Sequence, residues 1–366
     1  MKVGFFSPLP PARTGVADYS AALLGALRRK TDIDIAPRHS DVNLYHLGNN
    51  QIHRPIYNRA IAEPGVVVLH DAVLQHFFLG SLTEEQYVEE FAFNYGYWRQ
   101  SLARELWRNR ASSGLNAKYF EYPMLKRIAQ ASRAVVVHNA AAAELVRAHA
   151  PEARVIEIPH LVEPAETPDA ADILRFRAGL GIAPEAFLFG VFGYLRESKR
   201  VIAILRQFEK LHRDLPHTAL LIAGQFVSAD LARAAGPLLR LQGIARAGHL
   251  NPREFSLAAA SVDACINLRY PSAAETSGIA VRLMGMGKPV MLTCGIETDA
   301  YPESACFRIE SGIAEECALS EHMMLAAAFP ETAREVGRQG ARHIREYHAP
   351  ERVAELYWET LCQSRA

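Results

Sequence analysis

A group of cations follows an apolar run in the second half of the chain. Residues 188–192 are strand-like, and Gly193 comes next, ahead of Arg196, Lys199 and Arg200. Three cations within five residues at the end of a strand can converge on phosphate oxygens. A glycine at such a turn lets the backbone approach a ligand closely. We interpret this segment as a candidate anion site, with a solvated basic turn as the alternative.

A carboxylate stands in the next candidate segment, which also follows an apolar run. Glu275 is followed by Thr276 and Ser277, either of which can cap a helix. Backbone N–H groups near Gly278 and Ile279 would then be available to an anion. A carboxylate about 4 Å from a phosphate charge costs on the order of 4 kcal/mol at an effective dielectric of 20, so we expect Glu275 to face neutral groups such as sugar hydroxyls. The alternative is an ordinary acid near a helix N-terminus.

Two further kinds of candidate lie in the first half of the chain. The loop after the first strand-like run ends at Gly15, which we expect at a helix N-terminus, where only a hydrogen side chain lets a diphosphate come close. His46, His70 and His138 each stand at or just after the end of a strand-like run. An imidazole there can donate to a substrate hydroxyl or take part in proton transfer. For His46 and His138 we prefer the alternative, a polar residue that bridges loops.

Several other chemistries lack their motifs in this sequence. There is no GxGxxG fingerprint, no HExxH helix and no GxSxG elbow, and Gly285-Met-Gly-Lys-Pro289 departs from a P-loop. The five cysteines include no CxxC pair. A zinc site is a weak alternative, since thiolates are missing beside its four candidate ligands, His46, His53, His70 and His76. We therefore expect neither a metal nor a bound cofactor.

Strand-sized apolar runs alternate with helical patterns along the chain, which is typical of parallel sheets covered by helices. The expected strands are residues 2–6, 42–46, 66–70, 134–137, 156–158, 188–192, 219–223, 244–247, 264–267, 289–293 and 306–309. The clearest helical patterns cover residues 18–29, 140–150, 201–212 and 351–362. A length of 366 residues predicts more than one domain. We expect two doubly wound α/β domains facing a cleft, with ligands at the carboxyl ends of the strands.

Composition excludes several classes of protein. Forty basic residues balance 40 acidic ones, which argues against a nucleic-acid partner. With 49% hydrophobic and 22% charged residues, the chain has the composition of a folded globular protein. The apolar run at the start is too short for a signal peptide, and no run approaches the roughly 20 residues that span a membrane. We expect a cytoplasmic protein.

The region 97–133 is strongly basic in this otherwise neutral chain. Two acids, Glu105 and Glu121, stand against eight bases: Arg99, Arg104, Arg108, Arg110, Lys118, Lys126, Arg127 and Arg133. Aromatic residues are interleaved with them, among them Trp98 and Trp107. Such a face fits peripheral contact with an anionic membrane or a charged lipid-linked acceptor. The alternative, which we slightly prefer, is an ordinary solvated helix.

Taken together, these motifs resemble those of family 4 glycosyltransferases with the GT-B fold. Residues 263–290 resemble the family's donor-binding signature, in which a Pro-Ser turn, a Glu, a glycine-containing helix start and a Gly-x-Pro-Val strand entry occur in order. The loop with Gly15 and the segment 67–71 look like the matching parts of the acceptor-side domain. The resemblance implies two Rossmann-like doubly wound parallel-sheet domains, with these bounds: an acceptor-side domain at 1–163, a linker at 164–185, a donor domain at 186–349, and a helix at 350–366 packing back on the first domain.

The same resemblance implies retaining transfer of a sugar from a UDP-, GDP- or ADP-sugar without an obligatory metal. Three residues would be catalytic: Glu275 would hold the hydroxyls of the donor sugar, Lys199 the diphosphate, and His70 the sugar near the reacting carbon. The departing phosphate would take the acceptor proton. Arg246 and Gly248 would line the nucleotide base. The implied diphosphate-binding residues are Gly15, Arg196, Lys199, Ser277, Gly278 and Ile279.

Two positions depart from the family pattern. Leu283 stands where a second Glu usually holds the ribose, and the adjacent Arg282 cannot accept a bond from ribose hydroxyls, so Arg282 contacts phosphate or the nucleoside is held differently. Tyr194 replaces the usual phosphate-binding Arg. We expect a glycosyltransferase acting on a glycan or lipid-linked acceptor in surface polysaccharide or glycolipid synthesis. The alternatives are a GT-B sugar-nucleotide epimerase and an inactive pseudo-glycosyltransferase that binds nucleotide sugars.

Overall fold

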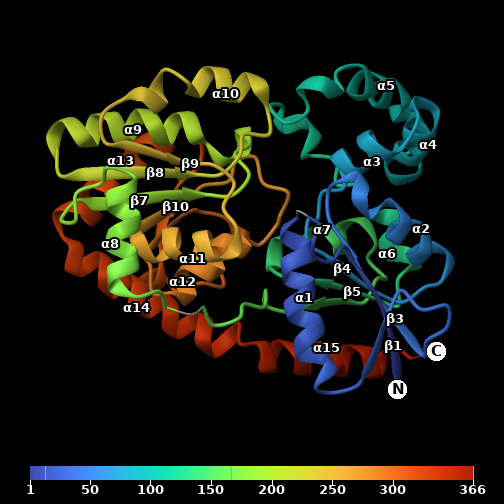
Figure 1. Cartoon of the computed structure of the whole chain (residues 1–366). Helices are drawn as coiled ribbons and strands as arrows, with labels where there is room; N and C mark the ends of the chain where they lie inside the picture. Colours follow the sequence, from blue (N-terminus) through green and yellow to red (C-terminus); the bar gives the residue numbers. More distant parts are fainter. Residues whose placement is uncertain (13, 166, 366) are drawn as a thin grey trace. The chain divides into compact units, whose positions relative to one another are not determined.

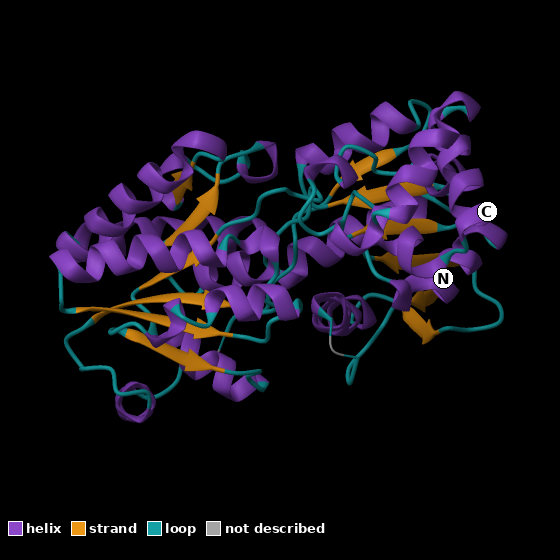
Figure 2. Cartoon of the chain, turned by 90° about the horizontal axis from the view of Figure 1, so that it is seen from above, coloured by secondary structure: helices purple, strands orange, loops and turns teal. Residues whose placement is uncertain are grey.

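The computed structural model describes residues 1–12, 14–165 and 167–365, which form two compact units. The first unit consists of Met1–Glu163, Pro271–Gly278 and Tyr347–Ala366, and the second of Pro164–Tyr270 and Ile279–Glu346. Each unit contains one six-stranded sheet of parallel strands with helices packed against it (Figures 1 and 2). The segment Pro271–Gly278, which the sequence analysis places in the second domain, groups with the first unit.

The sheet of the first unit has the strand order β2-β1-β3-β4-β5-β6. Its strands are β1 (Lys2–Phe6), β2 (Asp32–Ile35), β3 (Val42–Leu47), β4 (Val66–Leu69), β5 (Ala134–Val137) and β6 (Val155–Glu157). Five of them lie where the sequence predicts strands. The sequence does not predict β2, because this edge strand buries only Ile33 and exposes its two aspartates and Ile35. Such a strand gives no apolar run.

Helices cover both faces of this first sheet. They are α1 (Gly15–Arg28), α2 (Arg54–Ala62), α3 (Gln75–Ser81), α4 (Glu84–Tyr95), α5 (Gln100–Arg108), α6 (Lys126–Ala131), α7 (Ala140–His149) and α15 (Pro350–Gln363). Alternate residues of β4 face opposite cores, because side chains alternate along a strand. Val66 and Val68 pack with α1 and α15, whereas Val67 and Leu69 pack with the core formed by α2 to α7.

The last helix of the chain packs on the first one (Figure 1). Their contact is apolar along most of its length, and the hydroxyl groups of Tyr19 and Tyr357 lie 2.9 Å apart within it. At its exposed edge, Arg29 donates to Glu351 at 3.1 Å. Residues from both ends of the chain therefore form one core.

The sheet of the second unit has the strand order β12-β11-β10-β7-β8-β9. Its strands are β7 (Phe187–Phe192), β8 (Thr218–Ala223), β9 (Ile244–Ala247), β10 (Ala264–Asn267), β11 (Val290–Thr293) and β12 (Phe307–Ile309). The α-helices are α8 (Ala170–Gly179), α9 (Val201–Asp214), α10 (Ala229–Ala235), α11 (Pro252–Ser261), α12 (Gly278–Gly285), α13 (Glu315–Ala328) and α14 (Pro330–Tyr347). All six strands lie where the sequence predicts them, so the doubly wound α/β fold is confirmed for both units.

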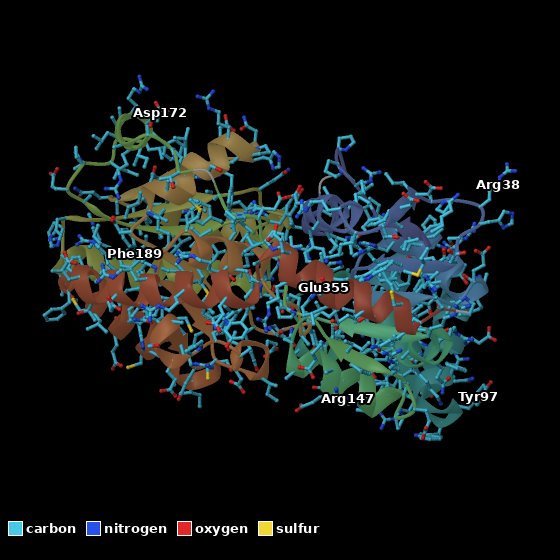
Figure 3. The ribbon with its side chains drawn as sticks, turned by 90° about the horizontal axis from the view of Figure 1, so that it is seen from below. Arg38, Tyr97, Arg147, Asp172, Phe189 and Glu355 are labelled. Carbon is cyan, nitrogen blue, oxygen red and sulfur yellow. The ribbon has the colours of Figure 1, made fainter. Side chains whose placement is uncertain are left out.

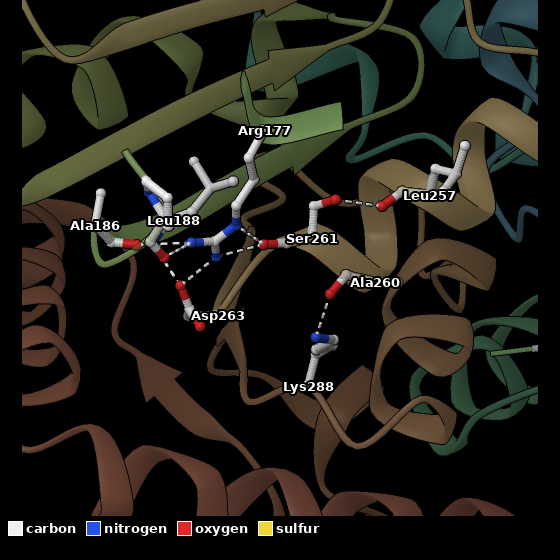
Figure 4. Close-up of polar contacts among 9 residues, drawn as sticks. Arg177, Ala186, Leu188, Leu257, Ala260, Ser261, Asp263 and Lys288 are labelled. Carbon is white, nitrogen blue, oxygen red and sulfur yellow. Dashed lines mark hydrogen bonds and ion pairs between the residues drawn. The ribbon is translucent and has the colours of Figure 1, made fainter. Parts of the chain in front are cut away.

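A buried arginine ties α8 to the sheet of the second unit (Figure 4). Arg177 donates to the backbone carbonyls of Ser261, Pro184 and Ala186 at 2.6 to 3.0 Å and to the carboxylate of Asp263 at 2.7 Å. Asp263 in turn accepts the backbone N–H of Leu188 at 2.8 Å. The segment read as a linker therefore carries a helix that is bonded to the starts of β7 and β10.

Each sheet has one point at which the direction of strand addition reverses. In the first sheet this switch point lies between β1 and β3, and in the second it lies between β7 and β10. Loops that leave a sheet in opposite directions open a crevice at the carboxyl ends of the two strands, where α/β proteins bind ligands. None of the described helices combines the length and apolar character needed to cross a membrane.

Candidate functional site

At the switch point of the second sheet, the buried side chain of Lys199 lies next to Gly193. Gly193 follows β7 with φ of 88°, and a Cβ there would stand 3.0 Å from Nζ of Lys199 and 2.5 Å from Cδ1 of Ile279. Lys199 is only 7% exposed and donates to the carbonyl of Phe192. Three of the predicted residues therefore meet at this point. Burial raises the pKa of the neighbouring Cys265 thiol to about 12, and the Lys199 ammonium opposes that rise.

The other two cations of this segment have different surroundings. Arg196 is exposed at the start of the short helix η5 (Glu197–Lys199). Arg200 has a left-handed backbone with φ of 57°, and its Nε donates to Glu315 at 2.7 Å. Glu315 is only 1% exposed, so this ion pair holds a buried carboxylate at the start of α13. Of the three cations, Lys199 alone is enclosed at the switch point.

The helix α12 carries the positions that depart from the family pattern. The Arg282 guanidinium lies over the ring of Phe255 on α11, 5.1 Å from its centroid, and Leu283 is fully buried. The helix sequence contains no acid. At the end of β9, Arg246 and Gly248 are exposed, and a Cβ at Gly248 would meet no atom within 4 Å.

The turn that contains Glu275 is bonded to the loops of the first unit. Its Ala273 carbonyl accepts the N–H of Ala72 at 2.9 Å, directly after His70 and Asp71 in the sequence. Its Ala274 carbonyl accepts Nδ2 of Asn139 at 2.9 Å. Ala274 itself has φ of 53°, a conformation that costs energy for a residue with a side chain. These bonds hold the turn against the carboxyl ends of β4 and β5.

Glu275 is half-buried, and one of its oxygens is engaged by its own turn. Its Oε2 accepts the backbone N–H of Ala273 at 2.8 Å and the Ser272 hydroxyl at 3.4 Å. Ser277 is buried two residues further on, and α12 begins at Gly278. A Cβ at Gly278 would stand 3.2 Å from Cε1 of His160. Glu275, Ser277 and Gly278 thus belong to the first unit, and Gly278 lies beside His160.

Gly15 is the first residue of α1, at the helix N-terminus where the sequence predicts it. The hydroxyl of Thr14 caps the helix by accepting the N–H of Ala17 at 3.1 Å. A Cβ added to Gly15 would meet no heavy atom of the described residues within 4 Å. Internal packing therefore gives no reason for a glycine here.

His70 lies in a cluster of buried aromatic and imidazole rings. Its Nε2 is 3.0 Å from Nδ1 of His46, and its ring centroid is 4.8 Å from that of Tyr19 and 5.1 Å from that of His138. Burial, reinforced by His138, holds the pKa of His70 well below its usual 6.5. His70 is therefore a neutral imidazole at pH 7.

Two members of this histidine cluster are bonded to backbone carbonyls. His138 Nδ1 lies 2.9 Å from the oxygen of Ile158, and burial lowers the pKa of His138 to about 4. His53 Nδ1 lies 3.1 Å from the oxygen of His46, and burial lowers its pKa to about 4 as well. Within the described part of the chain, no group of three or more His, Cys, Asp or Glu side chains is arranged to hold a metal ion.

Three residues of this region are not predicted from the sequence as site residues. Asn139 caps α7 by accepting the N–H of Ala142 and also donates to the turn of Glu275. The rings of Tyr19 and His160 meet edge to face within the cluster, with their centroids 4.7 Å apart. An Asn before a helical run is a recognisable cap signal. Its second role depends on tertiary contacts, which no local pattern reveals.

Solved structures share this fold along nearly the whole chain. They include Anabaena Alr3699/HepE in complex with UDP and glucose, at 13% identity over 99% of this chain and 100% of that one, with a TM-score of 0.71. Sucrose-phosphate synthase from Thermosynechococcus elongatus is 13% identical over 99% and 98%, with a TM-score of 0.68. WaaG, a glycosyltransferase involved in lipopolysaccharide biosynthesis, is 15% identical over 96% and 98%, with a TM-score of 0.61.

No family model and no curated protein matches the sequence. Because the solved structures are only 13 to 15% identical to this chain, their likeness establishes the fold alone. This fold is GT-B, with two Rossmann-like units, as the sequence predicts.

Proposed function

We propose that this protein is a retaining family 4 glycosyltransferase that transfers a sugar from a nucleotide diphosphate donor to a glycan or lipid-linked acceptor. The observation that carries the proposal is the enclosed cation at the switch point of the second sheet. Lys199 supplies a positive charge, Gly193 leaves the backbone approachable, and Ile279 lies in the first turn of α12. A cation next to the N-terminus of a helix is a site for phosphate.

The remaining roles follow from the same proposal. Lys199 binds the diphosphate and stabilises the charge that develops as it departs. Glu275 and His70 bind hydroxyl groups of the donor sugar, and the open space in front of Gly15 admits phosphate. Arg246 and Gly248 line the base. The departing phosphate takes the acceptor proton, so the proposal requires neither a metal nor a cofactor.

A second candidate is a pseudo-glycosyltransferase that binds nucleotide sugars without turning them over. It is favoured by α12, where Leu283 is buried in place of an acid and Arg282 stacks on Phe255. Without a carboxylate to accept from the ribose, the donor loses one charge-assisted contact, of the kind worth about 1.5 to 3 kcal/mol. This candidate predicts binding without transfer.

Ligand-induced thermal shifts test donor binding. UDP, GDP, ADP and their sugars are added to the purified protein with and without magnesium, and a ligand at 100 times its Kd adds about 2.7 kcal/mol. We expect one nucleotide family to stabilise the protein independently of magnesium. In Lys199→Met the shift should disappear, whereas the matched control Lys210→Met, an exposed lysine on α9, should keep it. Equal shifts in both variants would contradict the proposed diphosphate site.

Transfer is tested with the nucleotide sugar that binds. A donor with labelled sugar is incubated with glycan and lipid-linked acceptors, and the product anomer is compared with the donor by NMR. Retention of the anomeric configuration in a labelled product supports the proposal. Interconversion of the donor sugar without an acceptor would identify an epimerase, and binding without any product would favour the pseudo-glycosyltransferase.

We also propose that the region 97–133 contacts an anionic membrane surface. Tyr97 and Trp98 are 73% and 81% exposed, and Tyr97 projects from the first unit (Figure 3). The bases Arg104 and Arg108 are exposed close by on α5. Exposed aromatic rings beside cations suit the interface of an anionic bilayer. Co-sedimentation of the protein with vesicles containing phosphatidylglycerol should weaken as the salt concentration rises and when Tyr97 and Trp98 are both replaced by Ala. Vesicle binding that does not change with salt concentration would refute this contact.

A further inference from the structure

Two histidines face each other at the carboxyl ends of neighbouring strands. His46 lies on β3 and His70 directly follows β4, the adjacent parallel strand. Nδ1 of His46 and Nε2 of His70 are 3.0 Å apart, and the ring planes differ by only 24°. His46 is fully buried and His70 is 9% exposed. The contact is thus a hydrogen bond between two enclosed imidazoles.

A hydrogen bond between two neutral imidazoles holds one proton, which fixes the tautomers of both rings. If His46 donates from Nδ1, its Nε2 is a bare lone pair. If His70 donates from Nε2, His46 must carry its own proton on Nε2. That Nε2 is buried and has no hydrogen-bond partner among the described residues. Buried side-chain N–H groups are rarely left unpaired, so the first arrangement, in which His46 donates, is favoured.

The neighbouring histidines follow the same rule. Nδ1 of His53 and of His138 each faces a backbone carbonyl oxygen, which can only accept, so each ring carries its proton on Nδ1. Their Nε2 atoms are buried and lack a partner within the described residues. The cluster therefore already leaves bare imidazole lone pairs unpaired, and His46 with a proton on Nδ1 matches this pattern.

We propose that His46 is a positioning residue that donates to Nε2 of His70 and thereby holds the His70 proton on Nδ1. In this tautomer His70 can donate from Nδ1 but cannot accept there. Its partner would be an oxygen atom of the donor sugar, and this last step rests on the proposed function. His46 itself touches no substrate.

Imidazole NMR of the ligand-free protein tests the tautomer directly. Long-range ¹H–¹⁵N spectra of ¹⁵N-histidine-labelled protein at pH 7.5 show which nitrogen carries the proton, and the His70 signals are assigned by their loss in His70→Asn. We expect His70 with the proton on Nδ1. A proton on Nε2 of His70 in the parent protein would overturn the inference.

Two substitutions of His46 separate positioning from packing. The side-chain amide of His46→Asn can still donate from near the Nδ1 position, whereas His46→Leu fills the space without a donor. His46→Asn should keep the His70 tautomer, and His46→Leu should move the proton toward Nε2. Thermal melts of both variants verify that they fold. An unchanged His70 signal in a folded His46→Leu variant would also refute the proposal.

Donor binding tests the consequence. The Kd of the nucleotide sugar should rise at least tenfold in His46→Leu and stay within about threefold in His46→Asn, with the Kd of the free nucleotide unchanged in both. Equal sugar affinity in the two variants would contradict the role of His46 at the sugar. If no nucleotide sugar binds the parent protein, the proposed function fails, while the spectra still decide the tautomer.

Discussion

Acidification should destabilise the first unit through its buried histidines. His53 and His138 have pKa values of about 4 in the folded protein, against 6.5 for an unperturbed histidine. Between these values the unfolded chain binds more protons than the native one, so stability is fully present above pH 6.5 and falls as the pH drops toward 4. Lowering the pH from 7 to 5 should cost about 2 kcal/mol for each of the two histidines.

This loss is a large share of the stability of a typical domain, about 5 to 15 kcal/mol. His46 and His70 act in the same direction, because burial also lowers their pKa values. The distribution of tryptophan makes the assay specific: the chain has three Trp residues, and Trp98, Trp107 and Trp358 all belong to the first unit. Urea titrations followed by tryptophan fluorescence at pH 7, 6 and 5 therefore report on that unit.

The variants His53→Asn and His138→Asn test the cause. Each keeps an amide donor near the carbonyl oxygen that the Nδ1 of the native ring faces, but neither can titrate. Each should therefore reduce the loss between pH 7 and 5 by about 2 kcal/mol, even if its stability at pH 7 is lower. His39→Gln, at an exposed position of the same unit, is the matched control and should keep the parental pH dependence. A parental pH dependence in both Asn variants would refute the reasoning.

Three further substitutions separate binding from folding. Gly15→Ala should leave the free energy of unfolding unchanged or raise it by up to about 1 kcal/mol, because a Cβ there meets no other atom within 4 Å, but it should weaken donor binding at least tenfold by calorimetry. The control Gly25→Ala, at an equally open position of the same helix, should bind the donor normally. Equal donor binding by both variants would remove Gly15 from the site. Glu275→Gln should lower the rate of sugar transfer by about 10- to 100-fold, because one charge-assisted hydrogen bond is lost. Its melting temperature should stay close to that of the parent protein. Full transfer activity in this variant would exclude a role of Glu275 at the sugar. Arg177→Met should destabilise the second unit by about 3 kcal/mol, which hydrogen exchange would detect as faster exchange in β7 and β10. The control Arg175→Met, at an exposed position of the same helix, should leave this exchange unchanged. If β7 and β10 stay protected in Arg177→Met, the arginine is dispensable for the stability of the unit.

The sequence predicts the sheets well because most of their strands are buried on both faces. Continuous apolar runs such as Val66–Leu69 arise when helices cover both sides of a parallel sheet. β2 escapes prediction because one buried Ile33 between exposed aspartates resembles a polar loop. Placing Gly193 and Lys199 needs only the order of the elements, since their loop directly follows a switch-point strand.

What the sequence does not predict depends on contacts between distant segments. The bond from Asn139 to Ala274 joins residues that are 135 positions apart, and the pair of Tyr19 and Tyr357 spans 338 positions. His46 is read as a loop-bridging residue because a single histidine at a strand end gives no sign of its partner. Its contact with His70 appears only when β3 and β4 are paired in register.

The neutrality of His70 narrows what it can do at the proposed sugar site. A general acid or base works best with a pKa near the working pH, whereas burial holds the pKa of His70 well below 6.5. At pH 7 the ring has no proton to give as an imidazolium and is a weak base. A neutral imidazole in an enclosed site is instead suited to donating one fixed hydrogen bond. This role agrees with a reaction in which the departing phosphate takes the acceptor proton, and with His46 orienting the ring through its 3.0 Å contact with His70.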